Sequence, residues 1–79
     1  MELSERIEVN PDVLLGKPVV MGTRLSVSFL LGLLAKGASF EEILDEYEGL
    51  ERQDLLACIN FAARVVDNDA FLPLSRSVA

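Results

Sequence analysis

Two glycines and a proline within seven residues constrain this chain more than any other feature. They lie in the stretch Gly-Lys-Pro-Val-Val-Met-Gly-Thr-Arg-Leu-Ser-Val, residues 16–27. Glycine permits a positive φ and proline fixes φ at about −65°, so this spacing imposes a specific backbone geometry. Thr23 and Arg24 follow where the extended run ends. The stretch therefore predicts a short extended run that leads into the first helix.

A short β-ribbon is predicted over residues 6–25. Residues 6–9 alternate polar and apolar side chains, which is typical of a strand with one buried face, and the Asn-Pro-Asp sequence at 10–12 ends it. Residues 19–21 form the second strand, and residues 24–25 are a candidate third. Because such a ribbon is marginal alone, we expect it to pack on helices or to pair with the ribbon of a second subunit.

The first predicted helix runs from Val27 to about Lys36, with Ser26 as its N-cap and Gly37 just beyond its end. Its apolar side chains lie on every face, so we expect neighbouring elements or a second subunit to cover it. Gly32 in its interior costs about 1 kcal/mol of helix propensity. A close crossing by another helix is the expected reason for that glycine.

Two further helices follow. Ser39 and Glu42 form a predicted capping box at the start of the second, and Gly49 ends it. The third is predicted from residue 51 or 52 to about Asp67. Its expected inward line is Leu55, Ile59, Ala62 and Val66.

The chain is thus expected to be a single domain, residues 1–79, of the mainly α class. A short N-terminal β-ribbon (6–25) precedes a three-helix, homeodomain-like (helix-turn-helix) bundle (26–67), and a C-terminal tail (68–79) follows. Pro73 favours an extended tail. Phe71, Leu72 and Leu74 are therefore candidates for docking on a partner, although folding back over the chain's own helices is an equal alternative.

Composition narrows the classes of function. A 79-residue chain with 51% hydrophobic residues has little interior, so a homodimer is predicted. The formal charge of −6 opposes binding to phosphate backbones. The single cysteine, Cys58, and an acidic start without a signal peptide favour the cytoplasm, and no apolar stretch is long enough to span a membrane.

Catalytic chemistry is not indicated. The sequence lacks histidine and has one cysteine, which excludes Ser-His-Asp and Cys-His pairs and a zinc cluster. A phosphate-binding loop around Lys17 would need glycine at position 11 and Ser or Thr at position 18, where the chain has Pro11 and Pro18. We therefore expect no enzyme activity, no cofactor, no metal site and no small-molecule substrate.

Two other sets of residues are candidates for contacts. Arg52, Gln53, Asn60 and Arg64 are the donors with which the third helix would read DNA, but acidic residues surround them, so a structural core is the favoured interpretation. Lys17 and Arg24 admit two interpretations. An arginine at a strand end most often hydrogen-bonds carboxylates or carbonyls within its own chain, and the alternative is contact with an acidic site on a partner.

One family combines these features. The chain resembles the family called domain of unknown function 433 in the Gly16-Lys17-Pro18 and Gly22-Thr23-Arg24 motifs, in Ile7-x-Val9-Asn10-Pro11, and in the corner at residues 35–44. The resemblance covers about residues 6–66. Glu51 departs from the Thr or Ser that commonly caps the third helix of the family, and the tail lies outside the shared part.

The resemblance implies a β-ribbon before a homeodomain-like unit, and a likeness to antitoxins encoded beside PIN-like putative ribonuclease toxins. The expected function is therefore that of an antitoxin in a type II toxin-antitoxin pair, which binds and neutralises such a toxin. The alternatives are a transcriptional regulator that binds operator DNA through the third helix, and a non-enzymatic dimeric interaction domain. Gly16, Lys17, Pro18, Gly22, Thr23 and Arg24 are the motif residues expected to have a structural or partner-binding role.

Overall fold

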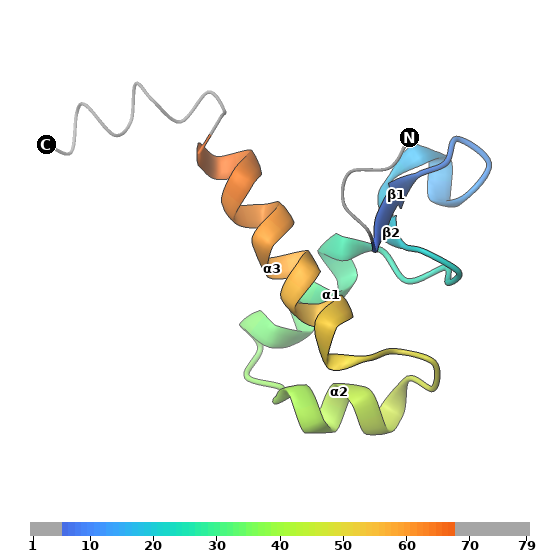
Figure 1. Cartoon of the computed structure of the whole chain (residues 1–79). Coiled ribbons are helices and arrows are strands. Elements are labelled where there is room, and N and C mark those ends of the chain that lie inside the picture. Colours follow the sequence, from blue (N-terminus) through green and yellow to red (C-terminus); the bar gives the residue numbers. More distant parts are fainter. Residues whose placement is uncertain (1–5, 68–79) are drawn as a thin grey trace, which may run out of the picture.

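The computed structural model describes residues 6–67, and this part of the chain forms two short strands followed by three helices (Figure 1). The predicted class, mainly α with an N-terminal β-ribbon, is confirmed. The elements in chain order are β1 (Ile7–Val9), the single turn η1 (Leu14–Gly16), β2 (Pro18–Val20), α1 (Val27–Ala35), α2 (Phe40–Glu46) and α3 (Arg52–Asp67).

The two strands pair antiparallel, with Ile7 opposite Val20 and Val9 opposite Pro18. Val19 also forms a bridge with Ser26, so the chain after the turn returns alongside β2 as a short third extended segment. Ile7 and Val20 are buried in the core against the helices. The ribbon is therefore stabilised by packing on the helices, which is one of the two outcomes expected for so short a sheet.

The predicted helix caps are present. The Ser26 hydroxyl accepts a hydrogen bond from the Phe29 amide at 3.0 Å and starts α1, which ends at Ala35. At α2 the Ser39 hydroxyl accepts from the Glu42 amide at 3.1 Å, and the Glu42 carboxylate accepts from the Ser39 amide at 2.8 Å. Both halves of the capping box are thus formed.

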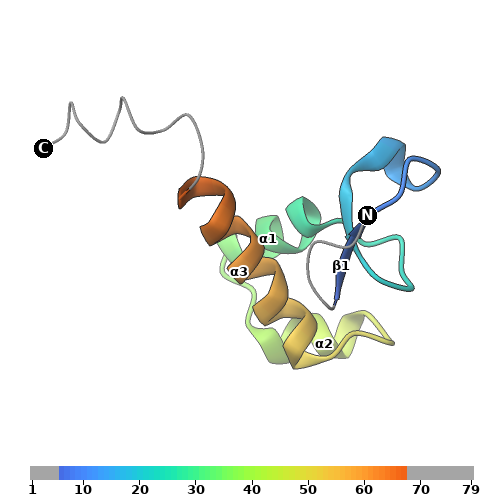
Figure 2. The same ribbon diagram turned by 45° about the horizontal axis from the view of Figure 1, so that its top comes forward.

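The core lies where the three helices meet the ribbon. α3 packs against α1, α2 and β1, while β2 contacts α1. Figures 1 and 2 show that the C-terminal half of α3 extends beyond the body formed by the other elements. The buried residues that form the core cluster are Ile7, Val20, Val27, Leu30, Ile43, Leu50, Leu55 and Cys58.

The predicted inward line of α3 is wrong in part. Leu55 is buried, but Ile59 and Val66 are 41% and 57% exposed, and Cys58 is fully buried. Residues 55 and 58 lie on the face that meets the body of the domain, whereas residues 59 and 66 lie on a neighbouring face. α3 carries apolar side chains on more than one face, so its periodicity alone does not identify the inward one.

Gly32 also differs from expectation. A β-carbon built at this position would have no non-local atom within 4 Å among the described residues. Thus no helix of residues 6–67 makes the close crossing that was expected to explain a glycine in the interior of α1.

Candidate functional site

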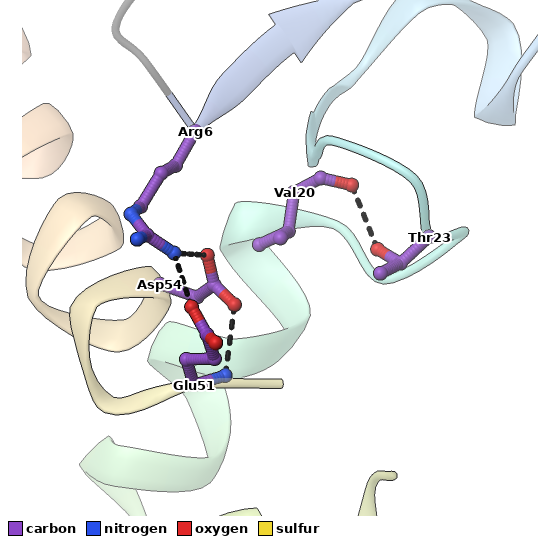
Figure 3. A network of polar contacts seen from close by, with 5 residues as sticks. All are labelled: Arg6, Val20, Thr23, Glu51 and Asp54. Carbon is purple, nitrogen blue, oxygen red and sulfur yellow. Dashed lines mark hydrogen bonds and ion pairs between the residues drawn. The ribbon is translucent and has the colours of Figure 1, made fainter. Parts of the chain in front are cut away.

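The turn after β2 holds the second half of the motif. The Val20 amide donates to the Leu25 carbonyl at 3.0 Å and closes the turn, and Gly22 at its tip has a φ of +79°. The Thr23 hydroxyl donates to the Val20 carbonyl at 2.8 Å (Figure 3). It also accepts from the Leu25 amide at 3.0 Å. Glycine and threonine thus fix the turn that carries Arg24.

Arg24 follows in this turn and has no partner among the residues that the structure describes. Its side chain is exposed, and it makes no hydrogen bond or ion pair with any residue in the range 6–67. The fork that an arginine at a strand end most often forms within its own chain is therefore absent here among the described residues. A guanidinium fixed at its base and free at its end is available for a carboxylate on another molecule.

The first half of the motif follows an unusual backbone. Leu14, Leu15 and Gly16 have φ values of 50°, 57° and 84°, so three successive residues lie in the left-handed region. This region costs a residue with a β-carbon about 1–2 kcal/mol, and glycine avoids that cost. Leu15 is nevertheless 97% exposed. An apolar side chain on a strained backbone and almost wholly in water points to a role outside the folding of this chain.

These two segments border one hollow of about 490 Å³ beside the start of α1. Its floor and walls are mainly apolar, and its two cationic side chains are those of Lys17 and Arg24. The exposed Phe29 packs edge to face on Tyr47, with ring centroids 5.8 Å apart. We call the residues that line the hollow the motif surface: Leu14, Leu15, Lys17, Arg24, Leu25, Ser26 and Phe29.

A different arginine forms the intramolecular fork. One terminal nitrogen of Arg6 lies 2.9 Å from the Asp54 Oδ1 atom and 2.9 Å from the Glu51 Oε1 atom (Figure 3). The hydrogen bond to Asp54, and to a smaller extent the one to Glu51, raises the pKa of Arg6 above its usual value. Asp54 also accepts from the Glu51 amide through Oδ2 at 2.8 Å, which is the half of a capping box that the Glu42 carboxylate forms at α2.

Sequence reasoning did not identify Arg6. The available signal was that Arg6 is the only basic residue among the first sixteen, while an acidic pair stands at positions 51 and 54. Nothing in that pattern gives the distance between them, because the pair forms only when β1 packs on α3.

The candidate DNA contacts on α3 are exposed. Gln53, Asn60 and Arg64 lie on one stripe, because steps of seven and four residues return to the same helix face. Arg52 differs, since its guanidinium carbon stacks 4.8 Å from the centre of the Phe40 ring. Acidic side chains stand exposed on the adjacent α2, namely Glu41, Glu42, Asp45 and Glu46.

The remaining candidates concern Cys58 and the tail. Cys58 is fully buried, and burial, followed by the negative charge of Asp54, raises the pKa of its thiol to about 11. The docking candidates Phe71, Leu72 and Leu74 lie outside the described residues. In the part of the chain from 6 to 67, no three Cys, Asp or Glu residues converge as metal ligands would, and no helix is long and apolar enough to cross a membrane.

Comparison with known proteins identifies the family. A family model described as Protein of unknown function (DUF433) matches residues 7–62, which include both strands, the motif surface, α1, α2 and most of α3. Neither the curated proteins nor the solved structures gave a match.

Proposed function

This chain belongs to the DUF433 family, and we propose that it is the antitoxin of a type II pair whose motif surface binds and neutralises a PIN-like ribonuclease. The observation that carries the proposal is the state of Arg24, which is exposed and has no intramolecular partner within residues 6–67. The toxin class comes from the family resemblance. The residues proposed to contact the toxin are those of the motif surface, chosen for their exposure and their arrangement around the hollow.

The motif surface has the chemistry of a protein-binding site. The apolar side chains that line the hollow offer surface that a partner can bury, and its two cations, Lys17 and Arg24, can pair with acidic groups of that partner. The guanidinium of Arg24 pairs with carboxylates in a planar, bidentate geometry, which suits an acidic site on the partner. The formal charge of −6 adds attraction to a basic, RNA-binding protein, which raises the association rate more than the affinity.

The turn geometry supports a contact role for Arg24. Thr23 is bonded on both sides and Gly22 occupies a backbone conformation open to few other residues, so the base of Arg24 is held before a partner arrives. Such pre-organisation reduces the entropy that binding costs. We propose no enzymatic role for these residues.

The test is co-expression with the product of the adjacent reading frame, followed by size-exclusion chromatography and calorimetry. We expect a complex that suppresses the ribonuclease activity of the partner, and an affinity at least about tenfold lower for Arg24→Ala. Arg64→Ala is the matched control, because Arg64 is also exposed but lies on α3. Unchanged affinity for Arg24→Ala, with or without an effect at Arg64, would refute the assignment of the motif surface.

Operator DNA is the second candidate ligand. It is favoured by the exposed polar stripe of Gln53, Asn60 and Arg64, which has the position of a recognition surface on the last helix of a helix-turn-helix unit. It is opposed by the exposed carboxylates of α2 and by the stacking of Arg52 on Phe40. Retardation of the chain's own upstream DNA that weakens in Arg64→Ala, with a shallower salt dependence, would support it.

A further inference from the structure

α3 carries a second apolar stripe that does not face the core. Its three large members, Leu56, Ile59 and Val66, are 48%, 41% and 57% exposed, and none belongs to the core cluster. Ala63 is exposed between them. We call Leu56, Ile59, Ala63 and Val66 the seam.

The spacing of the seam is that of a helix that pairs with another helix. Its members are separated by three, four and three residues, which is the a and d pattern of a heptad repeat. The seam continues into the C-terminal half of α3, which extends beyond the other elements in both views (Figures 1 and 2). Because all four seam side chains are exposed, a partner helix can contact them.

We propose that the seam is the surface through which two copies of this chain associate, with their α3 helices antiparallel. In an antiparallel pair, a positions of one helix meet d positions of the other. Leu56 then packs on Val66 of the second copy, and Ile59 packs on Ala63 of the second copy. Each layer joins a larger residue to a smaller one, which lets the helices approach closely without overpacking.

The charges around the seam favour a second copy as its occupant. Gln53 and Asn60, which flank it, are uncharged, and the antiparallel arrangement places Asn60 of one helix opposite Asn60 of the other. Arg52 at the start of α3 lies toward Asp67 at the end of the partner helix. Two chains that each carry a formal charge of −6 repel each other. Their association costs least at a surface where like charges of the two copies do not face each other.

A basic partner would instead complement the acidic exposed residues of α2. The seam has no such charge to offer. The seam and the motif surface also lie on different elements, so pairing of two copies leaves the hollow beside α1 available. The proposal of a seam dimer does not depend on the antitoxin function.

The first experiment measures the oligomeric state of the whole chain by sedimentation equilibrium and light scattering. We expect a dimer with a dissociation constant on the order of micromolar, and an increase of at least about tenfold for Ile59→Glu or Val66→Glu. Leu15→Glu is the matched control, because Leu15 is exposed but lies on the motif surface. Its dissociation constant should equal that of the wild type.

Two results would overturn the proposal: a wild-type monomer across this concentration range, or a dimer that survives both seam substitutions. If the wild type is monomeric and the seam substitutions instead weaken its binding to DNA or to another protein, the seam is the binding site for that ligand. Since Ile59 and Val66 are outside the core cluster, both variants should keep the wild-type circular dichroism spectrum. Their melting curves should match that of the wild type at concentrations well below its dissociation constant, where all three proteins are monomers.

A second experiment tests the antiparallel register. In a Cys58→Ala background, Leu56→Cys combined with Val66→Cys should form intermolecular disulfides under mild oxidation, whereas Leu56→Cys alone should not. A parallel pair would bring the two copies of residue 56 together and reverse that result. Efficient cross-linking of the single Leu56→Cys variant would therefore overturn the register.

Discussion

Arg6 and Asp54 are 48 residues apart in the sequence, and a hydrogen bond of 2.9 Å joins their side chains. Arg6 directly precedes β1, and Asp54 lies in the first turn of α3. Asp54 is only 6% exposed and uses its second oxygen to accept from the Glu51 amide. One carboxylate thus forms half of a capping box at the start of a helix and fastens the β-ribbon to that helix.

Replacing Asp54 with alanine should destabilise the domain by about 1–3 kcal/mol, because the variant loses this capping-box hydrogen bond and leaves the partner groups unsatisfied. Glu51→Ala is the control. Its carboxylate also contacts Arg6 but is 65% exposed, so its loss should change the free energy of unfolding by no more than about 0.5 kcal/mol. Urea unfolding of both variants measures the difference, and equal effects would contradict the dual role of Asp54.

Alanine at two glycines should act in opposite directions. Gly22→Ala should destabilise by about 1 kcal/mol or more, because φ is +79° there and a β-carbon is poorly tolerated at that angle. Gly32→Ala should stabilise by about 0.5–1 kcal/mol, since the site lies in a helix and the added carbon meets nothing within 4 Å. Thermal unfolding of the two variants beside the wild type decides the matter. A loss of stability in Gly32→Ala would indicate a close contact from outside residues 6–67.

Cys58 should make stability depend on pH in alkaline solution. Its thiol has a pKa of about 11 in the folded chain against 9.0 ordinarily, so the folded state keeps the proton between these values while the unfolded state releases it. Stability therefore falls as pH rises from 9 to 11, by about 1 kcal/mol at pH 10 from this group. Cys58→Ala should lack this component. Urea titrations of both proteins at neutral and alkaline pH measure it, and parallel pH profiles would show that the thiol is not responsible.

Leu15 should be replaceable without loss of stability. Asparagine tolerates the left-handed region better than leucine, and the Leu15 side chain contributes little to packing because it is 97% exposed. We expect the melting temperature of Leu15→Asn to equal or exceed that of the wild type, while its affinity for the protein partner falls. A lower melting temperature would mean that Leu15 supports the fold itself.

The features that the sequence determined are local ones. The capping box of Ser39 and Glu42 and the turn at Gly22 depend on residues close together in the chain, and both are present. The order of ribbon and helices followed from the same kind of signal. Such signals survive in isolation because the backbone geometry is set by immediate neighbours.

The face of α3 that enters the core could not be chosen from its periodicity. Cys58 and Ile59 are adjacent and both apolar, yet Cys58 is buried and Ile59 is 41% exposed. A helix with apolar residues on several faces allows more than one packing. The choice depends on where α1, α2 and β1 lie around it.

The candidate site likewise has features that the sequence indicates and others that depend on tertiary packing. The glycines, Thr23 and Arg24 stood out in the sequence as a motif. Only the tertiary structure decided that Arg24 has no partner within residues 6–67, while Arg6 binds the carboxylates of Glu51 and Asp54. It also decided that Leu14 and Leu15 adopt left-handed backbone and line one hollow together with Phe29. The physical reason is that side-chain pairing and exposure are properties of segments brought together by packing, and no local preference specifies which distant segment arrives.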